Sequence, residues 1–214
     1  LIDFPVTIKQ VRRVMRELGI QCQIRQKRHS RVKQSEQYLQ DNVLNQCFYV
    51  ERPNQVWLAD STELKYGING EYKMRLSGVL DLYGRNLLAY NLSATETTAA
   101  EIQVFQRAFT RASNVHPLIH TDRGSAYTSK AFNRYLSQFE VTRSMSRPGT
   151  PYDNAPMERW WNEFKLRWMD RHPMAKTYKE FVQLVEDGIH YFNHDNRSGQ
   201  RDGLTPEEYW NKAI

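Results

Sequence analysis

The sequence has little cysteine: only Cys22 and Cys47 occur among 214 residues, and neither lies in a CxxC pair. A cysteine-ligated zinc site is therefore not expected, and two isolated thiols are typical of a reducing compartment. No apolar run approaches the roughly 20 residues that a membrane-spanning helix needs, so no membrane partner is expected. The first residues carry no secretory-signal pattern. Because the sequence begins at Leu1 and not at Met, we expect an upstream part of the chain beyond it.

The composition is that of a globular, basic protein. Hydrophobic residues make up 40% of the chain and aromatic residues 12%, which is enough for one packed domain with small appendages. The 30 Lys and Arg residues outnumber the 24 Asp and Glu residues, which gives a net charge of +6. A basic balance favours a polyanionic partner such as nucleic acid, although charge alone does not separate such a protein from a merely basic one.

Residues 1–20 contain apolar residues at helical spacing, and Gly19 follows them as a residue past a helix end would. The opposite face is basic and includes Arg12 and Arg13. This pattern indicates either the last helix of a DNA-binding helix-turn-helix unit or a plain amphipathic helix. Residues 21–53 follow as a strongly basic linker or arm, with a short helix expected within residues 39–50.

From residue 54 the pattern predicts an α/β domain. Strands are expected at 55–60, 72–82, 85–92, 118–120 and 141–144, and helices at 97–112, 129–139 and 154–168. Three strands followed by alternating helices and strands favour a mixed five-stranded sheet with helices on both faces. Residues 171–214 are expected to form a C-terminal helical extension. Its helix at 178–192 could serve either as an oligomer interface or as core packing.

Three acids stand at positions where this topology can bring them together. Asp60 ends the first strand, Asp122 follows the fourth, and Glu158 lies in the first turns of a late helix, with 35 residues between Asp122 and Glu158. Three close carboxylates repel one another and need a cation. Ligands that are all oxygen suit Mg²⁺ or Mn²⁺, and two such ions drive phosphodiester cleavage or strand transfer.

Each acid alone is a weak signal, because acids at element ends are mostly solvated. Asp81 is a rival to Asp60, but the following Tyr83-Gly84-Arg85 reads as a turn that Asp81 could brace. Asp153 is a rival to Glu158, but we expect it to act as a helix cap beside Asn154.

Several short runs resemble the integrase core of bacterial insertion-sequence transposases of the IS-three family. They are NQVWLADST at 54–62, HTDRGSAYTS at 120–129 and SMSRPG at 144–149, together with Asp153-Asn154-Ala155 and Glu158. The resemblance covers about residues 54–210 and includes the family's spacing of 35 residues between the second and third acids. The sequence departs from the family at 159–161 and 166–168, which affects helix contacts and not the three acids.

The resemblance implies a ribonuclease H-like fold, similar to that of retroviral integrases, and a catalytic, metal-binding triad of Asp60, Asp122 and Glu158. It implies hydrolysis at transposon ends and attack of the freed 3′-hydroxyl on target DNA, with no covalent enzyme intermediate. That activity implies that the substrate is double-stranded DNA and that a homo-oligomer assembles on two DNA ends. It also implies a bacterial, cytoplasmic protein that is associated with the nucleoid. A DNA-binding regulator with an inactive core and a structure-directed nuclease are the alternatives.

Four further residues are candidates for DNA contact. Lys165 shares a helix face with Glu158, Arg123 and Arg147 border the site in loops, and Asn154 lies at the helix start. Each of the four could equally be a solvated or structural residue. We expect His120 to orient the Asp122 loop. Three tryptophans are expected to pack in the core, namely Trp57, Trp160 and Trp161, and Trp160 could instead stack on an unpaired base.

Overall fold

A computed structural model describes residues 6–20 and 38–214 of the chain. The chain divides into two compact units, residues 1–34 and residues 35–214, which are described separately here. The predicted basic arm lies largely outside the described residues, as does Cys22.

The first unit contains helix α1, Ile8–Glu17, as the sequence predicts. A capping box starts the helix: the Thr7 hydroxyl accepts a hydrogen bond from the Gln10 backbone N–H, and the Gln10 side chain accepts one from the Thr7 backbone. Arg13 forms an i,i+4 ion pair with Glu17 at 3.6 Å. No residue of α1 is buried. A role for this helix in a helix-turn-helix unit stays a prediction.

The prediction of a short helix within residues 39–50 is wrong, because this segment forms bends and turns. Asn45 and Gln46 have left-handed φ values of 43° and 61°, which end any helix there. The Asn45 N–H donates to Asn42 Oδ1 at 2.8 Å, and the Met145 N–H donates to the Asp41 carbonyl at 3.1 Å. Local side-chain bonding and pairing with a distant strand therefore replace helical hydrogen bonds.

The second unit is built on a five-stranded sheet in the order β3-β2-β1-β4-β5. Its strands are β1 (Val56–Tyr66), β2 (Tyr72–Asp81), β3 (Asn86–Ser93), β4 (Leu118–Thr121) and β5 (Thr142–Met145). The first three strands are antiparallel, whereas β4 lies parallel to β1 and β5 parallel to β4. The predicted mixed sheet is confirmed, and β1 and β4 are neighbours in it, as they must be if Asp60 and Asp122 are to meet.

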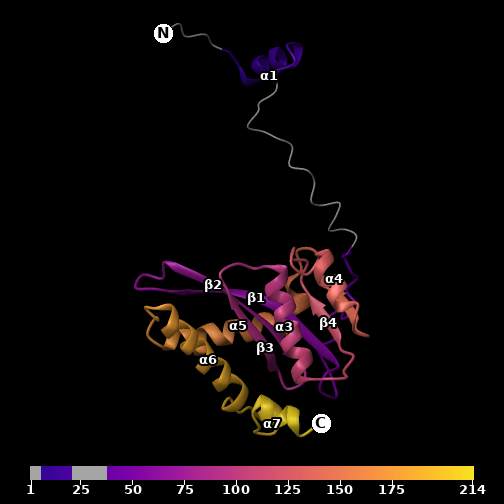
Figure 1. Cartoon of the computed structure of the whole chain (residues 1–214), viewed down its shortest axis with the longest axis vertical. Helices are drawn as coiled ribbons and strands as arrows, with labels where there is room; N and C mark the ends of the chain where they lie inside the picture. Colours follow the sequence, from indigo (N-terminus) through magenta and orange to yellow (C-terminus); the bar gives the residue numbers. More distant parts are fainter. Residues whose placement is uncertain (1–5, 21–37) are drawn as a thin grey trace. The chain divides into compact units, whose positions relative to one another are not determined.

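Helices cover both faces of this sheet, as Figure 1 shows for α3 on one face and α5 and α6 on the other. The helices are α3 (Thr98–Arg111), α4 (Lys130–Leu136), α5 (Ala155–Arg167), α6 (Tyr178–His194) and α7 (Pro206–Asn211). Short 3-10 turns lie at Pro151–Asn154, Met169–Arg171 and Gly199–Arg201. None of the helices in the described ranges is long and apolar enough to cross a membrane.

Strand β1 alternates between two hydrophobic cores. Val56 and Leu58 pack with α5 and α6, whereas Trp57 and Ala59 pack with α3 and α4. Trp210 of α7 joins the second core. The C-terminal segment therefore packs against the same sheet as the preceding helices, and the proposed domain boundary at residues 170/171 stays a prediction.

Candidate active site

Asp60 is the fifth residue of β1 and not its last, which corrects the expected strand end. The strand continues because residues 61–66 pair with residues 72–77 of β2 in a long hairpin. Alternation along β1 places Asp60 on the face of Val56 and Leu58, toward α5. The Asn154 Nδ2, just before α5, donates to the Ala59 carbonyl at 3.4 Å. This contact ties the start of α5 to the strand that carries Asp60.

Asp122 follows β4 directly, and β4 pairs in parallel with β1 through Leu58 and His120. Continuing this register by two residues sets Asp122 beside Asp60, as the topology predicts. The Gly124 N–H donates to Asp122 Oδ1 at 2.8 Å, which holds the carboxylate in its loop. Protein atoms displace solvent from this carboxylate and raise its pKa, although the residue as a whole is exposed.

Glu158 lies in the first turn of α5 and is exposed. The loop before the helix is held by Asp153, a buried acid whose carboxylate accepts from the Arg147 backbone N–H at 2.8 Å and from Arg147 Nη2 at 2.7 Å. This ion pair holds the pKa of Asp153 well below its usual range. The expected cap role of Asp153 is therefore wrong, because Arg147 takes its carboxylate, and Asn154 stands at the cap without a side-chain cap bond.

One cavity of about 510 Å³ brings the three acids together. Asp60, Asp122 and Glu158 all line it, with Arg123, Arg147 and Asn154. The pKa of Asp60 is raised to about 7, mainly by burial and in addition by the negative charges of Asp122, Glu158 and Glu96, while a backbone hydrogen bond from Ser61 acts in the opposite direction. The carboxylates are therefore close enough to repel one another.

The donor chemistry of this cavity fits a divalent cation. Within the described residues, no salt bridge involves Asp60, Asp122 or Glu158, so their charges have no Lys, Arg or His partner. The Asn154 Oδ1 is buried without a hydrogen-bond partner. However, residues 6–20 and 38–214 contain no group of three or more His, Cys, Asp or Glu side chains that lie close enough together to hold a metal ion as they stand. The site fits a divalent cation because its side chains offer oxygen ligands and because they line the same cavity.

Two acids near the site are missed by the sequence analysis. Glu96, in the loop between β3 and α3, accepts a hydrogen bond from the Ser61 hydroxyl at 3.1 Å and adds negative charge near Asp60 and Asp122. Glu101, in the first turn of α3, is buried and accepts from Tyr127. Neither belongs to a motif, because only the packing of α3 against the sheet brings them near the site.

The candidate DNA contacts differ in their surroundings. The Arg123 Nε donates to the Ser146 carbonyl at 2.8 Å, and Arg147 is paired with Asp153, so both line the cavity in fixed positions. Asn154 is buried, and Lys165 is half-buried two turns along α5 and does not line the cavity. Arg12 and Arg13 lie on α1, in the other unit.

Several other side chains are structural. His120 is fully buried between Ser144 Oγ (2.8 Å) and Ser146 Oγ (3.0 Å), and burial lowers its pKa to about 4, so it is a neutral link between β4 and β5. Asp81 accepts hydrogen bonds from Trp210 Nε1 and the Tyr83 N–H, and so braces its turn as expected. The three tryptophans singled out in the sequence are all buried, at 0%, 6% and 3% exposure for Trp57, Trp160 and Trp161.

Comparison with known proteins places this site in a family. Two family models, both described as integrase core domain, match residues 50–151 and 140–206. The putative transposase InsK of insertion sequence element IS150 from Escherichia coli K12 is 30% identical over 208 residues, which cover 96% of this chain and 71% of that protein. A transposase-like protein from Haemophilus influenzae is 27% identical and covers 96% of this chain and 94% of its own length.

Solved structures agree on the fold. The HTLV-2 integrase catalytic core in complex with magnesium matches with a TM-score of 0.56 at 20% identity, over 75% of this chain and 99% of that one. The integrase of a simian T-cell lymphotropic virus intasome matches with a TM-score of 0.61, over 76% of this chain and 57% of that one. The fold is thus that of the ribonuclease H-like integrase cores, which define a class of polynucleotidyl transferases. This chain belongs to the IS3 family of bacterial insertion-sequence transposases and is a DNA transposase of the integrase type.

Proposed function

We propose that Asp60, Asp122 and Glu158 are the catalytic triad of this transposase, which cleaves a phosphodiester at a transposon end and joins the freed 3′-hydroxyl to target DNA. One observation carries the proposal: three acids from β1, the β4 loop and α5 line one cavity, and their charges raise the pKa of Asp60. Acids without a cationic partner are costly there unless a ligand uses them.

The proposed cofactor is a pair of divalent ions, either Mg²⁺ or Mn²⁺, which the three carboxylates would hold. Such ions would activate the attacking oxygen and stabilise the leaving one. The integrase core domain is a divalent-metal-dependent family, and the HTLV-2 core was solved with magnesium. The chain's own contribution is placement: parallel pairing fixes Asp60 beside Asp122, and the bond from Asn154 to Ala59 fixes the start of α5.

Positive side chains around the cavity are proposed to hold double-stranded DNA, both transposon ends and target. Arg123 and Arg147 stand at its border, and Lys165 lies further along α5. Arg12 and Arg13 on α1 are proposed to bind DNA phosphates from the other unit. Because transposition joins two ends, we propose a homo-oligomer on DNA, acting at the bacterial nucleoid.

Single substitutions of the acids test the triad. Asp60→Asn, Asp122→Asn and Glu158→Gln are expected to reduce Mg²⁺- or Mn²⁺-dependent cleavage and strand transfer by about 10²–10³-fold or more, because each removes a charge from the reacting centre. Binding to the same DNA should change little. The readout is a gel assay on DNA carrying the element's ends.

Asp170→Asn is the matched control, because it removes one exposed carboxylate outside the cavity. Normal cleavage by the three triad variants would reject the assignment. Equal cleavage of DNA with and without transposon ends would favour a structure-directed nuclease instead.

A further inference from the structure

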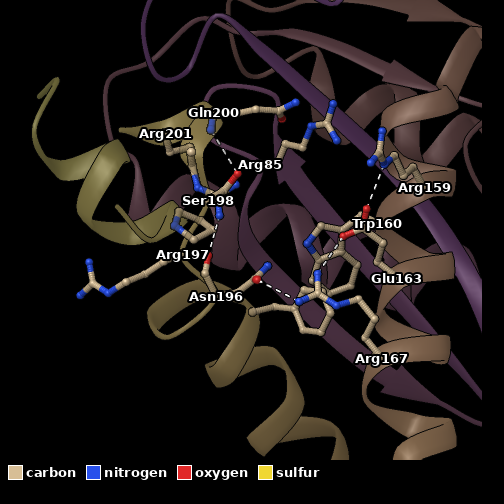
Figure 2. A pocket seen from close by; sticks show the side chains of 13 residues that line it. Arg85, Arg159, Trp160, Glu163, Arg167, Asn196, Arg197, Ser198, Gln200 and Arg201 are labelled. Carbon is tan, nitrogen blue, oxygen red and sulfur yellow. Dashed lines mark hydrogen bonds and ion pairs between the residues drawn. The ribbon is translucent and has the colours of Figure 1, made fainter. Parts of the chain in front are cut away.

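A second cavity, of about 570 Å³, lies beside α5 and contains none of the three acids. Figure 2 shows the side chains that line it, which come from α5, from the stretch between the end of α6 and the start of α7, and from the turn between β2 and β3. Arg159, Glu163 and Arg167 recur every four residues and so share one face of α5. At 100° per residue, this face points away from the one that carries Glu158 and Lys165.

The lining of this cavity is strongly positive. It holds a single carboxylate, Glu163, and five arginines: Arg85, Arg159, Arg167, Arg197 and Arg201. Glu163 is shared, since Arg159 Nε lies 2.9 Å from one of its oxygens and Arg167 Nη1 lies 3.4 Å from the other. Arg197 has its own partner, because it forms two 2.8 Å bonds to Glu208 and extends away from the other labelled arginines in Figure 2.

Arg85 and Arg201 carry the excess charge. No carboxylate in the described part of the chain lies within salt-bridge distance of either guanidinium. Burial lowers the pKa of Arg85, and the charge of Arg159 lowers it further. Burial also lowers the pKa of Arg201, followed by the charge of Arg85. The negative charge of Glu163 opposes both pKa shifts, but Glu163 is already shared by Arg159 and Arg167. A bound anion would therefore relieve the repulsion between the arginines.

Two of the arginines are held in place by contacts within the protein. Arg201 donates from Nη2 to the Asn196 carbonyl at 2.5 Å and from Nε to the Leu204 carbonyl at 3.3 Å. Arg167 donates to Asn196 Oδ1 at 3.3 Å and lies over the Phe192 ring, 5.7 Å from its centroid. Because these two guanidinium groups are already ordered, they lose little freedom on binding an anion. The backbone of Arg85 has a left-handed φ of 58°, a strained conformation for arginine.

We propose that this arginine cavity binds backbone phosphates of a DNA segment, at a site separate from the triad cavity. Arg159 and Arg167 are about 12 Å apart along the helix axis, the axial length of about three to four phosphates on one strand. The cavity is assigned to phosphates and not to bases, because Trp160, which lines it, is only 6% exposed and offers no open ring face on which a base could stack. It rests on the DNA-transposase function and is independent of the triad assignment.

The salt dependence of DNA binding tests this proposal. The double variant Arg85→Gln/Arg201→Gln is compared with the wild type on a random-sequence duplex between 50 and 200 mM salt, with EDTA present so that metal binding by the triad does not contribute. Loss of two phosphate contacts should lower the slope of log K against log salt by about one to two units. Arg85→Lys/Arg201→Lys keeps the charge and should keep most of the slope.

Two further variants make the test decisive. Lys130→Gln/Arg134→Gln removes an equal charge of two units from exposed positions of α4 and should leave the slope unchanged. Glu163→Gln removes the only carboxylate of the cavity, so it should tighten DNA binding several-fold, whereas loss of a purely structural ion pair would not. If the double variant does not fold, the proposal is tested by Glu163→Gln, which should tighten DNA binding, and by the single variant Arg159→Gln, which should lower the slope.

An unchanged slope in the arginine variants would overturn the proposal. A smaller oligomer with an unchanged slope would overturn it too, and would assign the cavity to a contact with an acidic protein surface. Triad variants should keep the wild-type slope, so failure of one assignment is distinguishable from failure of the other.

Discussion

At the scale of single residues, Glu101 is a buried acid that has no Lys, Arg or His within salt-bridge distance in the described part of the chain. It is 1% exposed and accepts hydrogen bonds from the Ser77 hydroxyl at 2.5 Å and the Tyr127 hydroxyl at 2.9 Å. Burial raises its pKa to about 7, and the charges of Glu96 and Asp122 act in the same direction. The two hydroxyl bonds lower the pKa without restoring its ordinary value.

This shift predicts a pH-dependent stability. The folded protein holds the Glu101 proton more tightly than the unfolded chain, so the stabilising contribution is complete below about pH 4.5 and is lost as the pH rises toward 7. Glu101→Gln removes this titration, and its amide can still bond both hydroxyls. Between pH 5 and 8 without divalent metal, the wild type should lose up to about 3 kcal/mol of unfolding free energy relative to the variant. Urea denaturation measures this, and a constant difference across that range would contradict it.

At the scale of elements, the segment before α5 depends on one ion pair. Asp153 accepts hydrogen bonds from four donors: the Arg147 backbone N–H, Arg147 Nε and Nη2, and Gln46 Nε2 at 2.8 Å. It thereby joins the loop between β5 and α5 to a distant turn. Glu158 follows five residues later. A contact outside the triad therefore holds the segment that leads into the helix of Glu158.

Asp153→Asn is expected to weaken this clamp, because one amide oxygen cannot accept from all four donors. Cleavage should fall by about 10- to 100-fold through misplacement of Glu158, while DNA affinity stays within about threefold. Cleavage rate and binding measured on one substrate separate the two effects. Glu140→Gln is the control, since Glu140 lies in an exposed turn 3.8 Å from His116. Wild-type cleavage by the Asp153 variant would show that the clamp does not position the acid.

At the scale of the whole molecule, the C-terminal helices are part of the core. Trp210 is buried among residues of α3 and β3, and its indole N–H donates to Asp81 at 2.7 Å. Phe181 and Val185 of α6 fill the opposite core. The sheet that carries Asp60 thus packs against side chains from 23 to 52 positions beyond Glu158.

Trp210→Ala should lower the unfolding free energy by about 3–5 kcal/mol, from the cavity it leaves and from the lost bond to Asp81. Chemical denaturation followed by tryptophan fluorescence should still show one transition for residues 38–214. Two separate transitions, or a loss below about 1 kcal/mol, would instead support an independent C-terminal extension. Tyr209→Phe, at the position directly before Trp210 in α7, controls for substitution of an aromatic residue there.

Sequence reasoning succeeded where the signal is local. The element order, the mixed sheet and the bracing role of Asp81 follow from periodicity, turn residues and strand adjacency. It failed where contacts are distant: residues 39–50 pair with the β5 region through Asp41, and Arg147 takes the Asp153 carboxylate. The arginine cavity escaped notice because Arg85, Arg159 and Arg201 come from three separate parts of the chain.

By itself, the sequence determined which acids are available, how far apart they lie along the chain and which elements carry them. Those properties depend on side-chain type and on spacing within one strand or helix. The tertiary structure decided that Asp60 lies within its strand, that the pKa of Asp60 rises and that Arg85 and Arg201 lie beside two arginines that already share one carboxylate. Burial and charge repulsion act between residues that only packing brings together, so no local pattern records them.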